Sequence, residues 1–172
     1  LGGRTVGLAG MGAVPRLLAP VLEAMGAEVI YTARHRHGDV PWRWCGKEEL
    51  LARADILSLH MPLTPETAGW LDGRAMATMR PGAILINTAR GGLVDETALL
   101  RNLDSGRIAA AGLDVFAEEP PAPDHPLFRR ENLVCAPHVA WFTTGTLARS
   151  LEVAIDNCRR LATGRPLRHR VV

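Results

Sequence analysis

Short apolar runs alternate with helix-like stretches along most of this chain, and this alternation limits the folds that the chain can adopt. The runs cover residues 5–9, 27–31, 55–59, 83–87, 109–115 and 133–136, and the stretches expected to be helical cover residues 14–25, 47–53, 74–79, 96–104 and 143–161. Apolar runs this short, with turn residues at their ends, are typical of strands that are buried on both faces of a parallel sheet. The pattern therefore predicts an α/β protein with a Rossmann-like, doubly wound parallel sheet, helices on both faces, and a ligand site beyond the carboxyl ends of the strands.

Length and composition agree with a single globular domain over residues 1–172. The chain is 47% hydrophobic and 22% charged, its net charge is +2, and no apolar run approaches the length of about 20 residues that a membrane helix needs. Its basic residues are all arginines except Lys47 and form no long cationic tract, so neither nucleic acid nor a membrane is a predicted partner. Cys45, Cys135 and Cys158 have no paired spacing, which predicts neither a disulfide framework nor a metal site and favours the cytoplasm.

The turn after the first predicted strand carries two of the three glycines of the dinucleotide-binding fingerprint. Gly10 allows a tight turn, Gly12 lets the backbone approach a pyrophosphate, and the N–H groups of Ala13 and Val14 at the helix start would bind the anion. The third glycine is replaced by Pro15, which a first helical turn tolerates because the missing N–H would have no partner there. The glycines alone would also fit an ordinary strand-to-helix turn, so the predicted phosphate site depends on the residues downstream.

The residues after the second predicted strand bear on the choice between NAD and NADP. Proteins that bind NAD place an acid about twenty residues past the glycines to hold the adenosine ribose, and Thr32 stands at that place here. Arg34 follows, with His35 and Arg36 behind it, and a guanidinium can hold a 2′-phosphate through two hydrogen bonds. NADP is therefore the preferred cofactor and NAD the alternative, while a solvated loop is the other interpretation of this cluster.

Four longer stretches resemble the D-isomer-specific 2-hydroxyacid dehydrogenases, closest in pattern to their glyoxylate and hydroxypyruvate reductases. They are residues 58–72 (SLHMPLTPETAGWLD), 79–99 (MRPGAILINTARGGLVDETAL), 106–121 (GRIAAAGLDVFAEEPP) and 136–143 (APHVAWFT). The resemblance implies the NAD(P)-binding domain of an enzyme that interconverts a small 2-hydroxy acid and its 2-keto acid by hydride transfer. It also implies a second, substrate domain, built mainly from the N-terminal third of the family's chains, so we expect this chain to be a piece of a longer protein.

Three residues fall on the family's catalytic positions: Arg90, Glu119 and His138. Arg90 follows the predicted strand that ends at Asn87, where a guanidinium can grip a substrate carboxylate and polarise the neighbouring carbonyl. His138 follows the last strand and is the candidate acid/base, and Glu119 would orient its ring. Glu119 is chosen over Glu118 because it stands directly before the proline. Without the resemblance, the three would be taken as a surface arginine, a loop acid and a structural histidine.

The resemblance also assigns residues to the cofactor site and to a subunit interface. The further cofactor residues are Pro62, Thr67, Thr88, Ala89 and Asp114. Trp141 resembles a variant of the glyoxylate and hydroxypyruvate reductases that could shape the substrate pocket, although a core or interface tryptophan fits as well. Such enzymes form homodimers through their cofactor domains, and the apolar segment around Trp70, Leu71 and Met76 is the candidate surface.

Two alternatives remain open at the level of the sequence. A dinucleotide-binding sensor or interaction module, like the corepressors that resemble these dehydrogenases, could keep the same three residues. A formate or phosphite dehydrogenase could use the same scaffold. Glu119 disfavours formate, because formate dehydrogenases of this pattern have a glutamine beside the histidine, but it leaves phosphite oxidation open.

Overall fold

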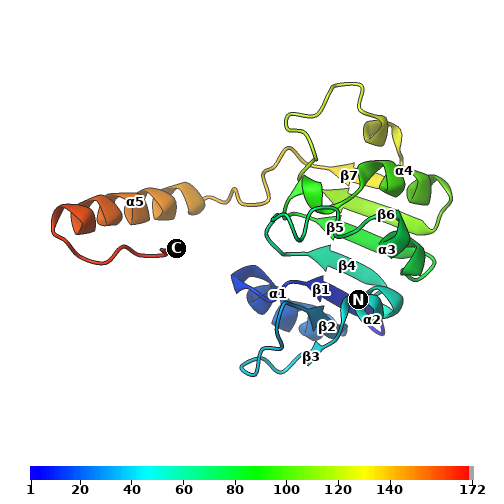
Figure 1. Cartoon of the computed structure of the whole chain (residues 1–172), viewed down its shortest axis with the longest axis horizontal. Helices are drawn as coiled ribbons and strands as arrows, with labels where there is room; N and C mark the ends of the chain where they lie inside the picture. Colours follow the sequence, from blue (N-terminus) through cyan, green and yellow to red (C-terminus); the bar gives the residue numbers. More distant parts are fainter. Residues whose placement is uncertain (171–172) are drawn as a thin grey trace. The chain divides into compact units, whose positions relative to one another are not determined.

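The computed structural model describes residues 1–170, and the chain divides into two compact units, Leu1–His138 and Val139–Val172. The first unit holds a seven-stranded sheet in the order β3-β2-β1-β4-β5-β6-β7 (Figure 1), and each strand is parallel to its neighbours. The strands are β1 (Thr5–Ala9), β2 (Glu28–Thr32), β3 (Arg43–Trp44), β4 (Ile56–Leu59), β5 (Ala83–Asn87), β6 (Ile108–Leu113) and β7 (Leu133–Cys135). The helices between them are α1 (Ala13–Ala24), α2 (Lys47–Arg53), α3 (Gly73–Thr78) and α4 (Glu96–Asp104), with short 3-10 helices η1 (Gly91–Leu93) and η2 (Pro126–Arg129). The predicted doubly wound α/β fold is confirmed.

The order of the strands reverses between β1 and β4. The chain builds β2 and β3 on one side of β1, then returns to place β4 on the other side, with Ala9 level with Leu59. A doubly wound sheet opens a crevice at the carboxyl ends of the strands where the order reverses. The loops that follow Ala9, Thr32 and Leu59 therefore meet at one edge of the sheet.

Helices cover the two faces of β1 and β2. Val6 and Leu8 belong to the buried cluster on the α1 side, while Ala9 belongs to the larger cluster on the α2 side. Gly7 points toward α2, and a Cβ at that position would lie only 2.9 Å from the Cβ of Ala54. The small residue lets α2 and β1 approach closely on that side of the sheet.

Burial over β5 differs from the prediction. Ala83, Leu85 and Asn87 are buried, but Ile84 and Ile86 between them are half-buried, so this strand alternates instead of being buried on both faces. The reason is that α1 packs against β2, and its apolar cluster extends only as far as Ile56 in β4. Within residues 1–138 one face of β5 therefore lacks the cover that β1 and β2 have.

Three other features were missed or misplaced at the level of the sequence. The sequence pattern does not predict the short strand β3 or the helices η1 and η2, and β6 ends at Leu113 rather than Val115. The proposed dimer surface is wrong in part, because Leu71 and Met76 are fully buried in the main core and cannot contact a partner. The apolar character of a segment does not show which of its side chains face the core.

The second unit contains α5 (Thr146–Ala162), which carries an apolar stripe of Leu147, Leu151 and Ile155. It begins three residues after the predicted start, because Thr143 starts a turn in which its carbonyl accepts a hydrogen bond from the Thr146 N–H.

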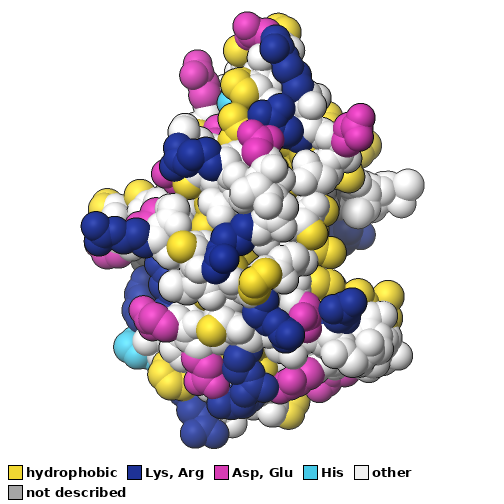
Figure 2. All heavy atoms as spheres, turned by 90° about the vertical axis from the view of Figure 1, so that its right-hand side faces the viewer, with side chains coloured by type: hydrophobic (Ala, Val, Ile, Leu, Met, Phe, Trp, Pro, Cys, Tyr) yellow, Lys and Arg dark blue, Asp and Glu magenta, His cyan; other side chains and the backbone are white. Residues whose placement is uncertain are grey.

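Among residues 1–170, no helix has the length and apolarity that crossing a membrane requires. On the face shown in Figure 2, basic and acidic side chains are interspersed rather than gathered by sign.

Candidate functional site

The glycine turn has the geometry of a phosphate-binding turn. Gly10 has φ +109°, and a Cβ there would lie 2.8 Å from the His60 carbonyl oxygen, so only glycine fits. A Cβ on Gly12 would meet nothing within 4 Å, which leaves open space in front of the start of α1. Ala13 and Val14 begin that helix, no acid occupies its first turn, and its first N–H groups have no intrahelical acceptor. This open, electropositive helix start fits a pyrophosphate.

A cavity of about 820 Å³ lies at the carboxyl ends of β1, β2 and β4. Of the predicted cofactor residues, it brings together the following: Gly10, Gly12, Thr32, Arg34, Pro62 and Thr67. The Thr67 hydroxyl donates to the Pro62 carbonyl at 2.7 Å and accepts from the Thr64 N–H at 2.8 Å. Thr67 therefore shapes the wall of the cavity by fixing the loop that carries Pro62.

The Arg90 loop is fixed by a residue that the sequence analysis did not single out. Asn87, the last residue of β5, is 1% exposed, and its side chain donates to the Arg90 carbonyl and accepts from the Ala89 N–H, both at 3.0 Å. The Arg90 guanidinium donates to the Ala89 carbonyl at 2.6 Å and is otherwise exposed. A buried amide with both of its ends satisfied thus presents Arg90 at the edge of the sheet, beside Thr88 and Ala89.

Two loops meet at Gly91. A Cβ at this position would lie 1.9 Å from the carbonyl carbon of Phe116, so the loop after β5 touches the backbone of the loop after β6. This approach brings Arg90 close enough to Glu119 for its charge to help lower the pKa of that carboxyl. The signal for this contact was the glycine pair after Arg90, which the sequence alone could not connect to residue 116.

Glu119 and His138 are joined by a hydrogen bond. Glu119 Oε2 lies 2.7 Å from His138 Nδ1, and Glu119 Oε1 accepts the Phe116 N–H at 3.0 Å. The hydrogen bond with His138 is the main reason that the pKa of Glu119 lies below its ordinary value, followed by the bond from the Phe116 N–H. Both carboxylate oxygens are used, so the imidazole has a fixed, ionised partner at neutral pH.

A second cavity, of about 500 Å³, lies beside this pair. Glu119 and His138 line it together with Asp114, which is 4% exposed, and with an apolar wall that includes Phe116 and Phe128. The Asp114 N–H donates to the Asn87 carbonyl, so Asp114 stands directly at the end of β6 beside the Arg90 loop. The predicted catalytic residues and Asp114 are thus brought to one edge of the sheet.

His60 is a further residue of the cofactor cavity that the sequence analysis left without a role. It follows β4, its ring nitrogen Nε2 lies 2.9 Å from the Ser58 hydroxyl, and burial lowers its pKa. The imidazole is therefore uncharged at neutral pH and adds an uncharged polar group to the lining of the cavity, next to the glycine turn. Its only sequence signal is its position after an apolar strand.

Comparisons with known proteins agree with this geometry. The sequence profile of the family described as "D-isomer specific 2-hydroxyacid dehydrogenase, NAD binding domain" matches residues 1–140. The chain belongs to this family. A D-3-phosphoglycerate dehydrogenase of Mycobacterium leprae is 48% identical over 166 residues, which are 94% of this chain and 31% of that protein. A glyoxylate reductase of Aeropyrum pernix is 41% identical over 169 residues, 96% of this chain and 50% of that one.

The likeness to solved structures covers all or nearly all of this chain. The TT0316 protein from Thermus thermophilus superposes with a TM-score of 0.94 at 43% identity, covering 100% of this chain and 55% of that one. A D-lactate dehydrogenase from Lactobacillus jensenii, solved with NAD+, has a TM-score of 0.91 at 34% identity and covers 98% of this chain and 55% of its own. A family member from Xanthobacter autotrophicus Py2, solved with NADPH, has a TM-score of 0.88 at 32% identity, with coverages of 98% and 71%. One of these structures thus holds NAD+ and another NADPH, and this chain spans between about a third and three quarters of the length of these relatives.

Proposed function

We propose that the protein to which this chain belongs is an NAD(P)-dependent 2-hydroxyacid dehydrogenase that acts as a 2-ketoacid reductase. The observation that carries this proposal is the 2.7 Å contact between Glu119 and His138 at the same edge of the sheet as Arg90 and the glycine turn. A general acid, its orienting carboxylate and a carboxylate-binding guanidinium are the side chains that this reaction requires.

The three side chains have separate tasks in the proposed reaction. The nicotinamide, when bound, supplies or accepts the hydride. His138 is held at Nδ1 by Glu119, which assigns the exchange of a proton with the substrate oxygen to Nε2. Arg90 binds the substrate carboxylate and polarises the adjacent carbonyl through the guanidinium nitrogens not directed to Ala89. Asp114, Thr88 and Ala89 are proposed to contact the cofactor at the same edge of the sheet.

NADP is the proposed cofactor, with NAD as the alternative. The cavity contains Thr32 where an acid would bind the ribose of NAD, and exposed Arg34 stands two residues further on. The Arg34 side chain is exposed, which makes its guanidinium accessible to a 2′-phosphate. Isothermal calorimetry of the chain with NADPH and NADH tests this assignment, with Arg34→Ala as the variant. We expect tighter binding of NADPH that falls to the level of NADH in the variant; equal affinities in the unmodified chain would reject it.

The substrate is proposed to be a small 2-keto acid such as glyoxylate or hydroxypyruvate, and the partner a second copy of the protein.

Residues 1–172 are proposed to form the dinucleotide-binding part of the protein, because the curated relatives are two to three times longer than this chain. Three free cysteines favour the cytoplasm. Neither nucleic acid nor a membrane is a proposed partner.

A steady-state assay of the full-length protein tests the substrate. It would offer glyoxylate, hydroxypyruvate and the phosphorylated hydroxypyruvate that the mycobacterial relative's name suggests, each with NADPH and NADH. Reduction of any of these with loss of turnover in His138→Ala supports the proposal. Cofactor binding with no turnover of any 2-keto acid would instead favour a dinucleotide sensor.

A further inference from the structure

One arginine joins the glycine turn to the loop between β2 and β3. Arg16 is the fourth residue of α1, and its Nε donates to the carbonyl of Met11, which lies between the two fingerprint glycines, at 3.2 Å. Its two terminal nitrogens bind the two carboxylate oxygens of Asp39, at 2.8 and 3.1 Å. A bidentate pair of this kind fixes orientation as well as distance. The guanidinium therefore connects the predicted pyrophosphate site to residues 33–42.

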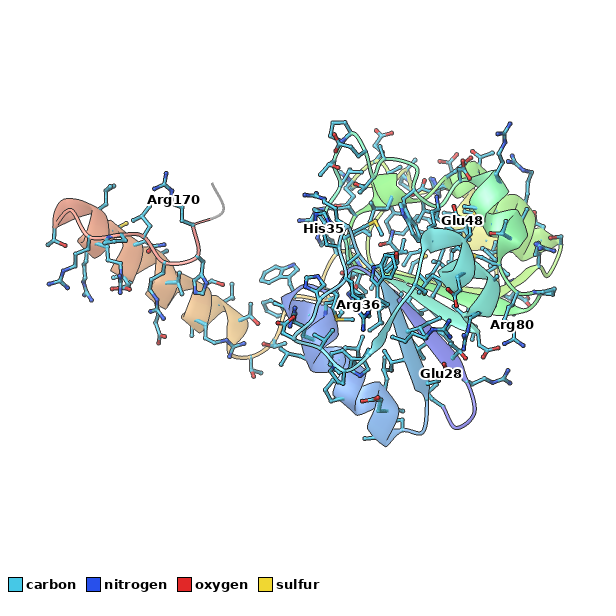
Figure 3. All side chains as sticks on the ribbon, turned by 60° about the horizontal axis from the view of Figure 1, so that its bottom comes forward. Glu28, His35, Arg36, Glu48, Arg80 and Arg170 are labelled. Atoms are coloured by element: carbon cyan, nitrogen blue, oxygen red, sulfur yellow. The ribbon has the colours of Figure 1, made fainter. Side chains whose placement is uncertain are left out.

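The loop has a second anchor at its centre. Tyr31 in β2 is fully buried, and its hydroxyl accepts the His37 N–H at 2.9 Å and lies 3.4 Å from the His37 carbonyl. The Arg16 guanidinium also lies 3.2 Å from His37 Nδ1. Exposed residues 34–36 stand between this anchor and the end of β2, and Figure 3 labels two of them, His35 and Arg36. The part of the loop that would meet a 2′-phosphate is thus held at both of its ends.

We propose that Arg16 is a positioning residue for cofactor specificity: by binding Asp39 and Met11 it holds residues 34–36 in the shape that accepts the 2′-phosphate of NADP, without binding that phosphate itself. The inference rests on the proposed use of NADP. Asp39 already occupies the two terminal nitrogens of Arg16, so attraction of the phosphate is left to Arg34 and its exposed neighbours. The same hydrogen bonds raise the pKa of Arg16 and lower that of Asp39, so both groups stay charged at neutral pH.

Preorganisation explains why such a clamp would change affinity. A loop that samples several shapes binds a ligand more weakly in proportion to the fraction of time it spends in the competent shape. If release of the clamp lowers that fraction to between about a tenth and a fifth, the affinity for NADPH falls about five- to tenfold. NADH has no 2′-phosphate and does not need the shape, so its affinity changes less.

Calorimetry with NADPH, NADH and 2′,5′-ADP separates a clamp from a direct phosphate ligand. The variants are Arg16→Ala, Asp39→Ala and, as a matched control, Arg53→Ala. The control breaks a 2.9 Å ion pair with Glu28, at the opposite end of β2 from the loop (Figure 3). We expect Asp39→Ala to weaken NADPH and 2′,5′-ADP about five- to tenfold with NADH changed less than about twofold. Arg16→Ala should weaken NADPH at least as much, and Arg53→Ala should change none of the three.

The opposite result for one variant would overturn the inference. If Arg16 were itself a phosphate ligand, removal of Asp39 would release it and tighten NADPH. Equal losses for NADPH and NADH in Asp39→Ala would mean that the pair has only a general structural role. A native chain that binds none of the three ligands would overturn this inference, while the proposed function is tested separately by turnover of the full-length protein.

Hydrogen exchange of the ligand-free chain tests the clamp without any cofactor. We expect the amides of residues 33–40 to exchange faster in Arg16→Ala and Asp39→Ala than in the native chain, with the remaining amides unchanged. Unchanged exchange in this loop would overturn the clamp even where the cofactors bind.

Discussion

The carboxylate of Glu119 holds the imidazole of His138 in place, and a backbone N–H of the same loop holds that carboxylate. Oε2 meets Nδ1 at 2.7 Å while Oε1 accepts the Phe116 N–H, so the carboxylate cannot rotate without losing a hydrogen bond. His138 has φ +54°, a conformation that costs free energy for a residue with a side chain. A strained backbone and a doubly bound carboxylate together define one orientation of the ring.

Glu119→Gln should lower kcat of the full-length enzyme. The amide keeps the size of the side chain but removes the charge that stabilises a protonated imidazole, so we expect a loss of about 10²-fold or more in kcat with a smaller change in KM. Steady-state kinetics with a saturating 2-keto acid measures both. Glu118→Gln, one residue earlier, is the control and should leave kcat unchanged. A kcat within about threefold of the native value in Glu119→Gln would mean that His138 acts without this partner.

The same substitution should change how stability depends on pH. The folded-state pKa of Glu119 is lowered, mainly by His138, so its contribution is present above the ordinary carboxyl pKa of about 4.3 and disappears as pH falls through the lower folded value. The pair is partly exposed, which limits the effect to below about 1 kcal/mol. Urea unfolding of the chain at pH 6 and at pH 3 measures it. We expect native and variant chains to differ at pH 6 and to converge at pH 3; a constant difference would contradict the linkage.

Glu66 should oppose the 2′-phosphate in the cofactor cavity. Its carboxylate accepts from the Thr64 hydroxyl at 2.7 Å, and its pKa is lowered mainly by that bond, with a smaller effect of Arg34. The cavity therefore holds a negative charge that attracts Arg34 and repels a phosphate. We expect Glu66→Gln to raise the affinity for NADPH a few-fold relative to the affinity for NADH. The effect should be smaller at high salt, and calorimetry at two ionic strengths would measure it. A change of equal size for both cofactors would contradict a charge effect on the 2′-phosphate.

At the scale of elements, the loops after β5 and β6 fit together only because Gly91 has no side chain. A Cβ at Gly91 would overlap the Phe116 carbonyl, which belongs to a backbone that cannot simply rotate away. We expect Gly91→Ala to lower the free energy of unfolding by about 1–3 kcal/mol or more, because it separates the loops that carry Arg90 and Glu119. Gly92→Ala is the matched control, since its Cβ would meet only the flexible end of the Leu63 side chain. Denaturant unfolding of both variants measures the difference; equal losses would contradict the close loop contact.

Sequence patterns predicted the elements that local physics determines. Strand β5 and helices α2 and α4 have the predicted bounds, and Asp95 caps α4 by accepting the Ala98 N–H at 2.9 Å, because periodicity and capping act over a few residues. The half-buried face of β5 was not predicted, because burial depends on which helix lies above a strand. The sequence does not predict Asn87 as the support of Arg90 either, because its hydrogen bonds with the Arg90 loop form only when that loop has folded.

At the scale of the whole molecule, the proposed cofactor and catalytic groups all lie within the first unit, Leu1–His138. The segment that follows is exposed from residue 139 to residue 144, and it includes two aromatic side chains, Trp141 and Phe142, that are 51% and 57% exposed. Exposed segments outside the regular elements are preferred sites of cleavage by proteases. Cofactor binding should therefore be separable from the second unit.

Limited digestion of the chain with chymotrypsin should produce a stable fragment that ends at Trp141 or Phe142. Because the fragment keeps the glycine turn and both cavities, we expect it to bind NADPH with a Kd within about twofold of the undigested chain. NADPH at about a hundred times its Kd would add about 2.7 kcal/mol of stability and slow further digestion. Mass spectrometry identifies the cut and calorimetry the affinity, with the double variant Trp141→Ser, Phe142→Ser as a control that should resist this cleavage. A fragment that folds but no longer binds NADPH would show that residues beyond His138 take part in the cofactor site.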